Sequence, residues 1–424
     1  MKLYIHIIVA FLALSIGYPY GGTNFILLMA PYLVYMVLKC DAVFLPALML
    51  HCASETSAFS IVFISFILLS ILKYKKLIKL KLGVLFWILI GLLPIFIWLV
   101  ITNILNHEMY PPLAVAQTGY YLSFYAFMYG VLVANTFTDK VLNSVYVTLF
   151  VTYLLYVSGL IEFTRIVVGF SFLFSALLAL FITSHSKNPL LFVLALFSFL
   201  SVLFIKEETT LTTLFVSVSS LLLTYLYFKN KNVLVQKLTG ILPFLIILVL
   251  YVYGITSYLN ASKLPMPHKT NIADLQDLKN WVHWKFFFDR APFWAGGFDQ
   301  IIEYKHLFPI PEMPDITAVL RNRSKMEISF GSHTTMIELV RKYGIIAGVL
   351  LNFCLIYIVL ISRKIFSIRE INPYTVPLYA MAVAVTIVLT LVGQYQILPG
   401  YAILSLGILG VAYGTYQFNT ENNS

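Results

Sequence analysis

Long hydrophobic runs separated by short polar connections dominate the chain. A helix needs about 20 mostly apolar residues to cross a bilayer, and fourteen runs approach or exceed that length. One of them, residues 42–52, is short enough to be re-entrant, so the prediction is 12–14 spans. The runs cover residues 3–18, 23–38, 42–52, 57–72, 82–104, 114–135, 144–161, 166–184, 190–205, 211–228, 238–256, 343–362, 374–393 and 397–415. The pattern predicts an all-α polytopic integral membrane protein.

Composition agrees with this pattern and excludes a soluble fold. Of the 424 residues, 60% are hydrophobic and 11% are charged, and mean hydropathy is +0.89. So few polar residues cannot cover the surface of a soluble protein.

The first hydrophobic run, residues 3–18, lacks a small-residue cleavage site and leads into the next run, so we interpret it as a retained span. The three cysteines, Cys40, Cys52 and Cys354, are far apart, which predicts neither a zinc site nor a disulfide framework.

The basic residues orient the spans. With the N-terminus in the cytoplasm, the cytoplasmic connections hold 15 of the 28 lysines and arginines. The short outer connections hold only Arg165 and Lys206, and residues 257–342 hold the other 11. Positive charge accumulates on the cytoplasmic side, so both termini are predicted to be cytoplasmic. The net charge of +10 then reflects topology, and nucleic-acid binding is not implied. The near-absence of ionisable residues within the spans argues against an ion-coupled transporter.

Residues 257–342 form the one long hydrophilic stretch and divide the chain into three parts. Residues 1–256 hold about eleven spans, residues 257–342 form a large outer loop, and residues 343–424 hold about three spans and a short tail. Within the loop, the sequence predicts an aromatic interfacial helix over Ala273–Asp289. A turn rich in proline and glycine, Asp289–Phe298, should follow, and the three prolines of Phe308–Pro314 predict extended chain.

A final helix is predicted to begin at Ser332 or Thr335 and to run into the span Gly344–Ser362. Thr335 and Glu338 have the spacing of a capping box. His333 would then lie at a helix start, which suits a phosphate ligand; the simpler alternative is a polar residue that precedes a span. The nearby basic cluster Arg321, Arg323 and Lys325 is either a solvated face or a site for an anion.

Two motifs in this loop resemble the bacterial O-antigen polymerase (Wzy) family, within the O-antigen polymerase and ligase superfamily. The first is the turn with Pro292, Gly296, Gly297 and Phe298; the second contains Ser332, His333, Glu338, Gly344, Ile345 and Gly348. The resemblance covers the loop and its flanking spans, about a quarter of the chain. It implies 10–14 spans and a large periplasmic loop late in the chain, in the bacterial inner membrane.

The resemblance also implies a reaction. A glycan leaves its undecaprenyl diphosphate and joins a hydroxyl of the next lipid-linked repeat unit. His333 is the implied base, since imidazole accepts a proton near neutral pH. The residues implied to bind the diphosphate or sugar are Arg290, Arg321, Arg323, Arg341, Lys206, Arg165 and Glu338. The family often has a Ser-Arg-Thr-like element before the loop; here Ile205–Thr210 offers only Lys206.

No Asp-x-Asp motif is present, so neither a metal nor any other cofactor is expected. The implied partners are the lipid-linked donor and acceptor and the bilayer, and the sequence leaves open whether a chain-length regulator protein also binds. Two alternatives remain open. A ligase of the same superfamily would transfer the glycan to lipid A core, although such ligases typically carry the arginine-rich element that this chain lacks. A lipid-linked oligosaccharide flippase would need a cationic cavity, and the spans contain few basic residues to line one.

Overall fold

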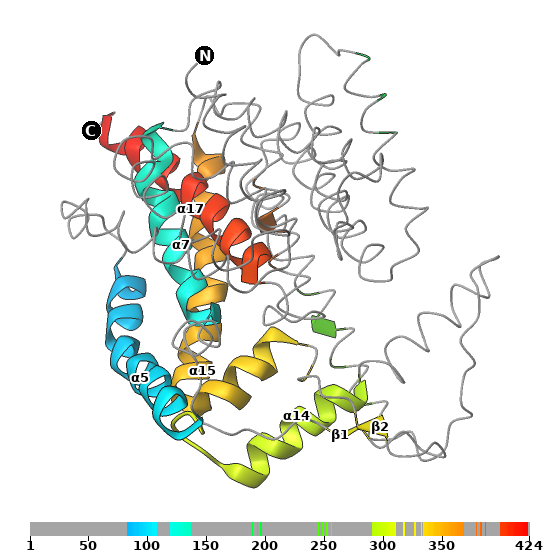
Figure 1. Ribbon diagram of the computed structural model, residues 1–424. Helices are drawn as coiled ribbons and strands as arrows, with labels where there is room; N and C mark the ends of the chain where they lie inside the picture. The colour runs from blue at the N-terminus through cyan, green and yellow to red at the C-terminus, as the bar shows by residue number, and fades with distance from the viewer. Residues whose placement is uncertain are drawn as a thin grey trace, which may run out of the picture.

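A computed structural model of the chain shows a group of helices, several of which pack against one another (Figure 1). It describes residues 83–107, 119–136, 291–310, 317–318, 326–327, 332, 334–368 and 399–422, and the isolated helical positions 189, 193, 196, 245, 248, 249, 252, 256, 379, 382, 383 and 386. Apart from a ribbon of two short strands, the regular structure in these residues is helical, as the sequence predicts.

Four long helices form the described bundle: α5 (Val84–His107), α7 (Gly119–Val133), α15 (Thr335–Ser362) and α17 (Pro399–Asn422). They coincide with the runs predicted at 82–104, 114–135, 343–362 and 397–415. Two segments, Val84–Leu105 and Thr335–Ile365, are long and apolar enough to cross a membrane. The other ten predicted spans lie outside the described residues or touch them only at isolated positions.

Hydrophobic composition makes α5 a helix despite an internal proline, Pro94. Proline cannot donate a backbone hydrogen bond, so the carbonyl of Ile90, four residues before Pro94, loses its usual helical donor. The Tyr121 hydroxyl of α7 donates to the adjacent carbonyl, that of Leu89, at 2.5 Å. The same tyrosine stacks on Phe96 of α5. Trp87 and Trp98, on the outward side of α5, are 71% and 61% exposed.

The core of the described residues lies where α17 packs along α7. Nearly every side chain of α7 from Tyr121 to Val133 is buried there. A Cβ at Gly410 of α17 would lie 2.9 Å from the carbonyl carbon of Phe127, so only glycine allows the two backbones this approach. Within a membrane the hydrophobic effect does not drive helices together, because lipid chains are as apolar as the side chains. Close contact between backbones then stabilises the helix pair through dispersion forces.

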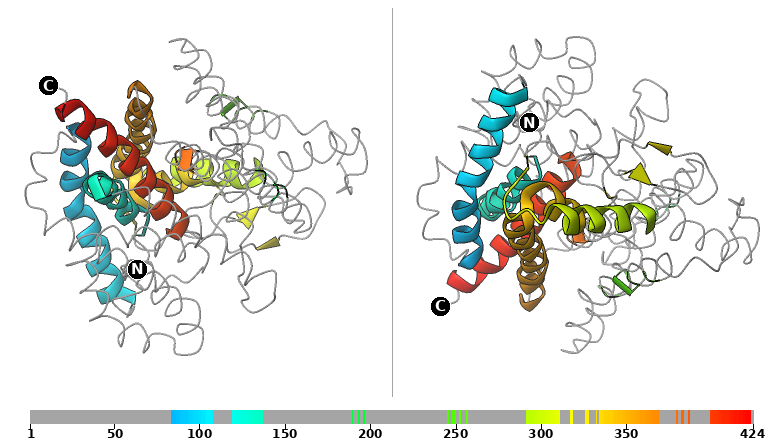
Figure 2. Two further views of the ribbon diagram at one scale, coloured as in Figure 1. Left: turned by 90° about the horizontal axis from the view of Figure 1, so that it is seen from above. Right: turned by 90° about the horizontal axis from the view of Figure 1, so that it is seen from below.

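Two shorter elements lie across the end of the bundle. These are α14 (Ala291–Tyr304) and a ribbon of β1 (Thr317–Ala318) and β2 (Met326–Glu327), paired antiparallel with Thr317 opposite Glu327. Short 3₁₀ turns follow α7 and α15, as η4 (Ala134–Thr136) and η7 (Arg363–Ser367). The views from above and below show α14 extending from the bundle at a wide angle to α15 (Figure 2).

Helix α14 corrects the sequence prediction: the expected turn over Asp289–Phe298 is wrong from Ala291 onward. Pro292 is compatible with a helix because it lies in the first turn, where its missing N–H has no partner to lose. The two glycines cost helix stability, roughly 1 kcal/mol each relative to alanine. Burial of Phe293 and Trp294 where α14 packs on α15 offsets that cost. Of the predicted extended segment, residues 308–310 are described and lie outside any helix or strand.

Candidate functional site

The candidate site lies at the start of α15, and its geometry begins with a break in that helix. Gly344 has φ 81° and ψ 166°, so α15 consists of a first segment, Thr335–Tyr343, and a second segment, Ile345–Ser362. An L-residue with a side chain rarely adopts this φ. The Asn352 side-chain amide donates to the Met336 carbonyl at 2.9 Å, which ties the two segments together at a sharp angle.

Residues 305–308, here called the strap, fill the break. Lys305, with φ 44°, ends α14 by donating its N–H to the Ile301 carbonyl. The carbonyls of His306 and Leu307 then accept from the backbone N–H groups of Ile345 and Ile346, at 3.1 and 3.3 Å. A helix start leaves its first N–H groups without partners, and the strap supplies two acceptors.

The His306 ring completes this connection from the other side of the break. It is 8% exposed, and its Nε2 lies 2.8 Å from the Arg341 carbonyl oxygen. Since a carbonyl can only accept, Nε2 carries the proton in this contact. His306 therefore satisfies a carbonyl near the end of the first segment of α15, where the break removes the next turn.

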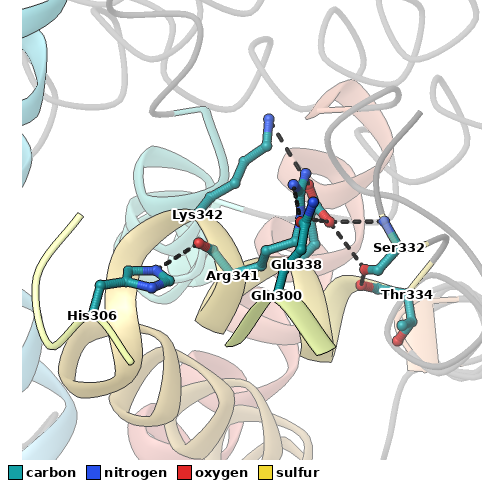
Figure 3. Close-up of polar contacts among 7 residues, drawn as sticks. All are labelled: Gln300, His306, Ser332, Thr334, Glu338, Arg341 and Lys342. Atoms are coloured by element: carbon teal, nitrogen blue, oxygen red, sulfur yellow. Dashed lines mark hydrogen bonds and ion pairs between the residues drawn. The ribbon is translucent and has the colours of Figure 1, made fainter. Parts of the chain in front are cut away.

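A buried ion pair occupies the first segment of α15 (Figure 3). The Arg341 guanidinium donates from Nη2 to Glu338 Oε1 at 2.6 Å and from Nε to Oε2 at 3.0 Å. Its Nη1 donates to Gln300 Oε1 of α14 at 3.0 Å. Glu338 and Arg341 are 1% and 2% exposed. Such a two-pronged contact is the strongest form of carboxylate pairing.

Ser332 joins this pair from the preceding segment. Its backbone N–H donates to Glu338 Oε2 at 2.9 Å, and its hydroxyl lies 3.0 Å from the same oxygen and 3.1 Å from the Thr334 carbonyl. Lys342 Nζ approaches Oε1 to 3.9 Å. We call Gln300, Ser332, Glu338 and Arg341 the Glu338 cluster. It holds the chain that enters α15 against both α14 and α15.

The predicted capping box is wrong in its details. The helix begins at Thr335, its N-cap is Thr334, and no side chain caps the end. Glu338 instead reaches back to the N–H and hydroxyl of Ser332, a partner six residues earlier rather than three. Its position in the first turn still suits a carboxylate, because the helix start carries positive partial charge.

The structure places only part of the predicted site. Glu338 and Arg341 are brought together and buried, while His333, Arg290, Arg321, Arg323, Lys206 and Arg165 lie outside the described residues. Ser332 and Thr334, the sequence neighbours of His333, are both fully buried. Sequence reasoning missed the roles of Gln300 and His306. Gln300 is on the helix that was predicted partly as a turn, and nothing in the sequence marks His306 as a partner of a broken helix.

The described residues thus form a helical assembly with two helices able to cross a membrane and a buried polar cluster beside one of them. Among these residues, no group of three or more His, Cys, Asp or Glu could hold a metal ion. No protein-family model, curated protein or solved structure matches the chain.

Proposed function

We propose that the chain is a membrane glycosyltransferase that joins undecaprenyl-diphosphate-linked oligosaccharide repeat units into O-antigen or a related surface polysaccharide. The proposal places the reaction on the periplasmic face of the bacterial inner membrane, with both chain termini in the cytoplasm. It starts from the motif around His333 and rests on one structural observation. The described residues of that motif that the resemblance singles out lie between the chain entering α15 and the first turn of its second, apolar segment.

Four of these residues have distinct physical roles in the structure. Ser332 and Glu338 hydrogen-bond to each other, Gly344 makes the break, and Ile345 receives the strap. A residue that must act on a lipid-linked substrate needs rigid surrounding structure close to the membrane. The buried Glu338 cluster is rigid, and its member Ser332 is adjacent to His333 in the sequence. This supports His333 as the functional residue.

The proposed reaction balances as a displacement at the anomeric carbon. The bond from that carbon to the diphosphate oxygen breaks, and a bond to the acceptor hydroxyl oxygen forms. The hydroxyl proton passes to the base, for which we propose His333. The departing diphosphate takes the electron pair and needs cations nearby.

Arg341 is engaged with Glu338 and Gln300, so we assign it to holding the site together. Glu338, implied by the resemblance to contact substrate, belongs to the same buried pair. We therefore propose that the diphosphate is bound by one or more of the other basic candidates, which are Arg290, Arg321, Arg323, Lys206 and Arg165. Of these, Arg321 and Arg323 lie in the sequence between the paired strands β1 and β2.

The test uses the purified chain in proteoliposomes with radiolabelled lipid-linked repeat units as the only other component. The wild type should produce a ladder of joined units. His333→Ala should slow its formation by about 10²- to 10⁴-fold, the usual contribution of a general base. His283→Ala, a change at another histidine of the same loop, is the matched control and should leave the rate unchanged.

Two outcomes would contradict the proposal at different levels. A full ladder from His333→Ala would remove His333 from the chemistry and leave the function intact. Transfer to added lipid A core without any joining of repeat units would instead identify a ligase.

A further inference from the structure

An apolar surface runs along α14 and the strap, and no described element covers it. On α14, Phe298 and Ile302 lie one turn apart and are 39% and 63% exposed, and Leu307 and Phe308 of the strap are 54% and 58% exposed. We call these four residues the α14 apolar edge. Phe293, about 140° around the helix from Phe298, is buried, and so is Trp294 in the first turn of the helix.

A third side of α14 is acidic and exposed. Asp299 and Glu303 follow Phe298 and Ile302 by one position each, so they lie about 100° further around the helix. The helix therefore presents one packed side, one apolar side and one charged side. A helix with this distribution is suited to a boundary between an apolar phase and water.

The α14 apolar edge continues onto the second segment of α15. Ile346 donates its backbone N–H to the Leu307 carbonyl, which puts the strap beside the first turn of that segment. From Ile346 an exposed apolar stripe follows α15 at helical spacing through Val349, Phe353, Ile356 and Leu360. The apolar edge and the stripe thus form one surface that passes around the Gly344 corner.

We propose that α14 lies in the interface of the bilayer at the Gly344 end of α15, with the α14 apolar edge among the upper acyl chains. The occupant is lipid because the edge joins the exposed apolar side of the second segment of α15, within the stretch Thr335–Ile365 that is long and apolar enough to span a membrane. The exposed acids beside it need water, which the headgroup layer provides and a dry protein interface does not. Contiguous apolar surface of this kind is rarely left in water.

This arrangement sets the depth of the Glu338 cluster. Gln300 of α14 binds Arg341 directly, so a helix held at the interface also holds the cluster near the headgroups. The inference concerns membrane placement and does not depend on the proposed reaction.

Spin labels on the full-length chain in lipid nanodiscs test the proposal. In a background with Cys40, Cys52 and Cys354 replaced by alanine, single cysteines at 302 and 308 carry the label on the apolar edge. Labels at 299 and 303 are matched controls on the acidic side of the same helix, and a label at 353 reports the lipid-facing stripe. Collision with oxygen, which partitions into the bilayer, is compared with collision with a water-soluble nickel chelate.

The expected result is a positive depth parameter at 302 and 308, of the same sign as at 353, and a negative one at 299 and 303. Preferential collision with the nickel chelate at 302 and 308 would place the edge in water and overturn the proposal. Exclusion of both reagents from 302 and 308 would show that protein covers the edge, from this chain or a second copy, and would overturn it equally.

Discussion

Glu338 is the residue on which the polar contacts at the start of α15 converge. It accepts from Ser332 and from two nitrogens of Arg341, and all three side chains are buried. A buried carboxylate is costly unless its charge is paired and its lone pairs are occupied. The spacing of three residues along one helix brings Glu338 and Arg341 onto the same face, while Gln300 and Ser332 reach them from other segments.

Arg341→Ala should therefore destabilise the protein strongly. It leaves the Glu338 carboxylate buried with only Ser332 and the more distant Lys342, and breaking a buried pair in this way costs about 3–5 kcal/mol. Gln300→Ala removes the acceptor of the hydrogen bond from Nη1 of the same guanidinium and should cost about 1 kcal/mol. Thermal unfolding of the purified variants in one detergent measures both changes.

Replacement of the whole pair is the control for this prediction. Glu338→Leu combined with Arg341→Met fills similar volume without charge, and should recover most of the stability that Arg341→Ala loses. If Arg341→Ala instead unfolds at the wild-type temperature, the pair does not support the corner of α15.

At the scale of elements, the corner of α15 depends on the fit between the break and the strap. A Cβ at Gly344 would lie 2.6 Å from the Leu307 carbonyl oxygen and 2.7 Å from the Phe308 carbonyl carbon. Both are backbone atoms, which cannot move aside as a flexible side chain can. The aromatic contact between Tyr343 and Phe96 of α5 further fixes the first segment in place.

Gly344→Ala is thus expected to destabilise the protein by about 1–3 kcal/mol from backbone strain alone, with the clash adding to it. Gly91→Ala is the matched control, because Gly91 lies in the helix α5 and a Cβ there meets no atom within 4 Å. That change should be neutral or should stabilise the helix by up to about 1 kcal/mol. Unfolding temperatures compare the two, and equal effects would mean that Gly344 needs no special conformation.

At the scale of the whole molecule, the proposed function requires that the loop 257–342 and the cytoplasmic connections lie on opposite sides of the membrane. The asymmetry of 15 basic residues against two across the short connections supports this orientation. Neither residue 75 nor residue 323 lies in the described part of the chain. Their sides of the membrane are predicted from the order of the spans and the distribution of basic residues.

A cysteine introduced at position 323 should react with a membrane-impermeant maleimide in intact spheroplasts, and one at position 75 should react only after lysis. The background again lacks the three native cysteines. The positive-inside rule predicts this pattern because lysine and arginine are retained on the cytoplasmic side. The reverse pattern would put the loop in the cytoplasm and rule out periplasmic chemistry.

The sequence by itself determined the class of fold in the described residues and the place of four helices. The runs at 82–104, 114–135, 343–362 and 397–415 all became helices, because the preference of a segment for an apolar phase is a sum over its own residues. The start of the last loop helix was also predictable to within a few residues. The small, polar and acidic residues that indicate a helix start are neighbours in the sequence, so this prediction requires no distant partner.

Only the tertiary structure decided how these helices meet. The turn predicted around Pro292 is a helix because Trp294 and Phe293 find a packing surface. Gly344 breaks α15 because carbonyls nearly 40 residues earlier replace the missing helical acceptors, and Arg341 binds Glu338 while Gln300 approaches from α14. Each of these outcomes depends on partners distant in the sequence, and hydrophobic pattern and local spacing contain no information about such partners.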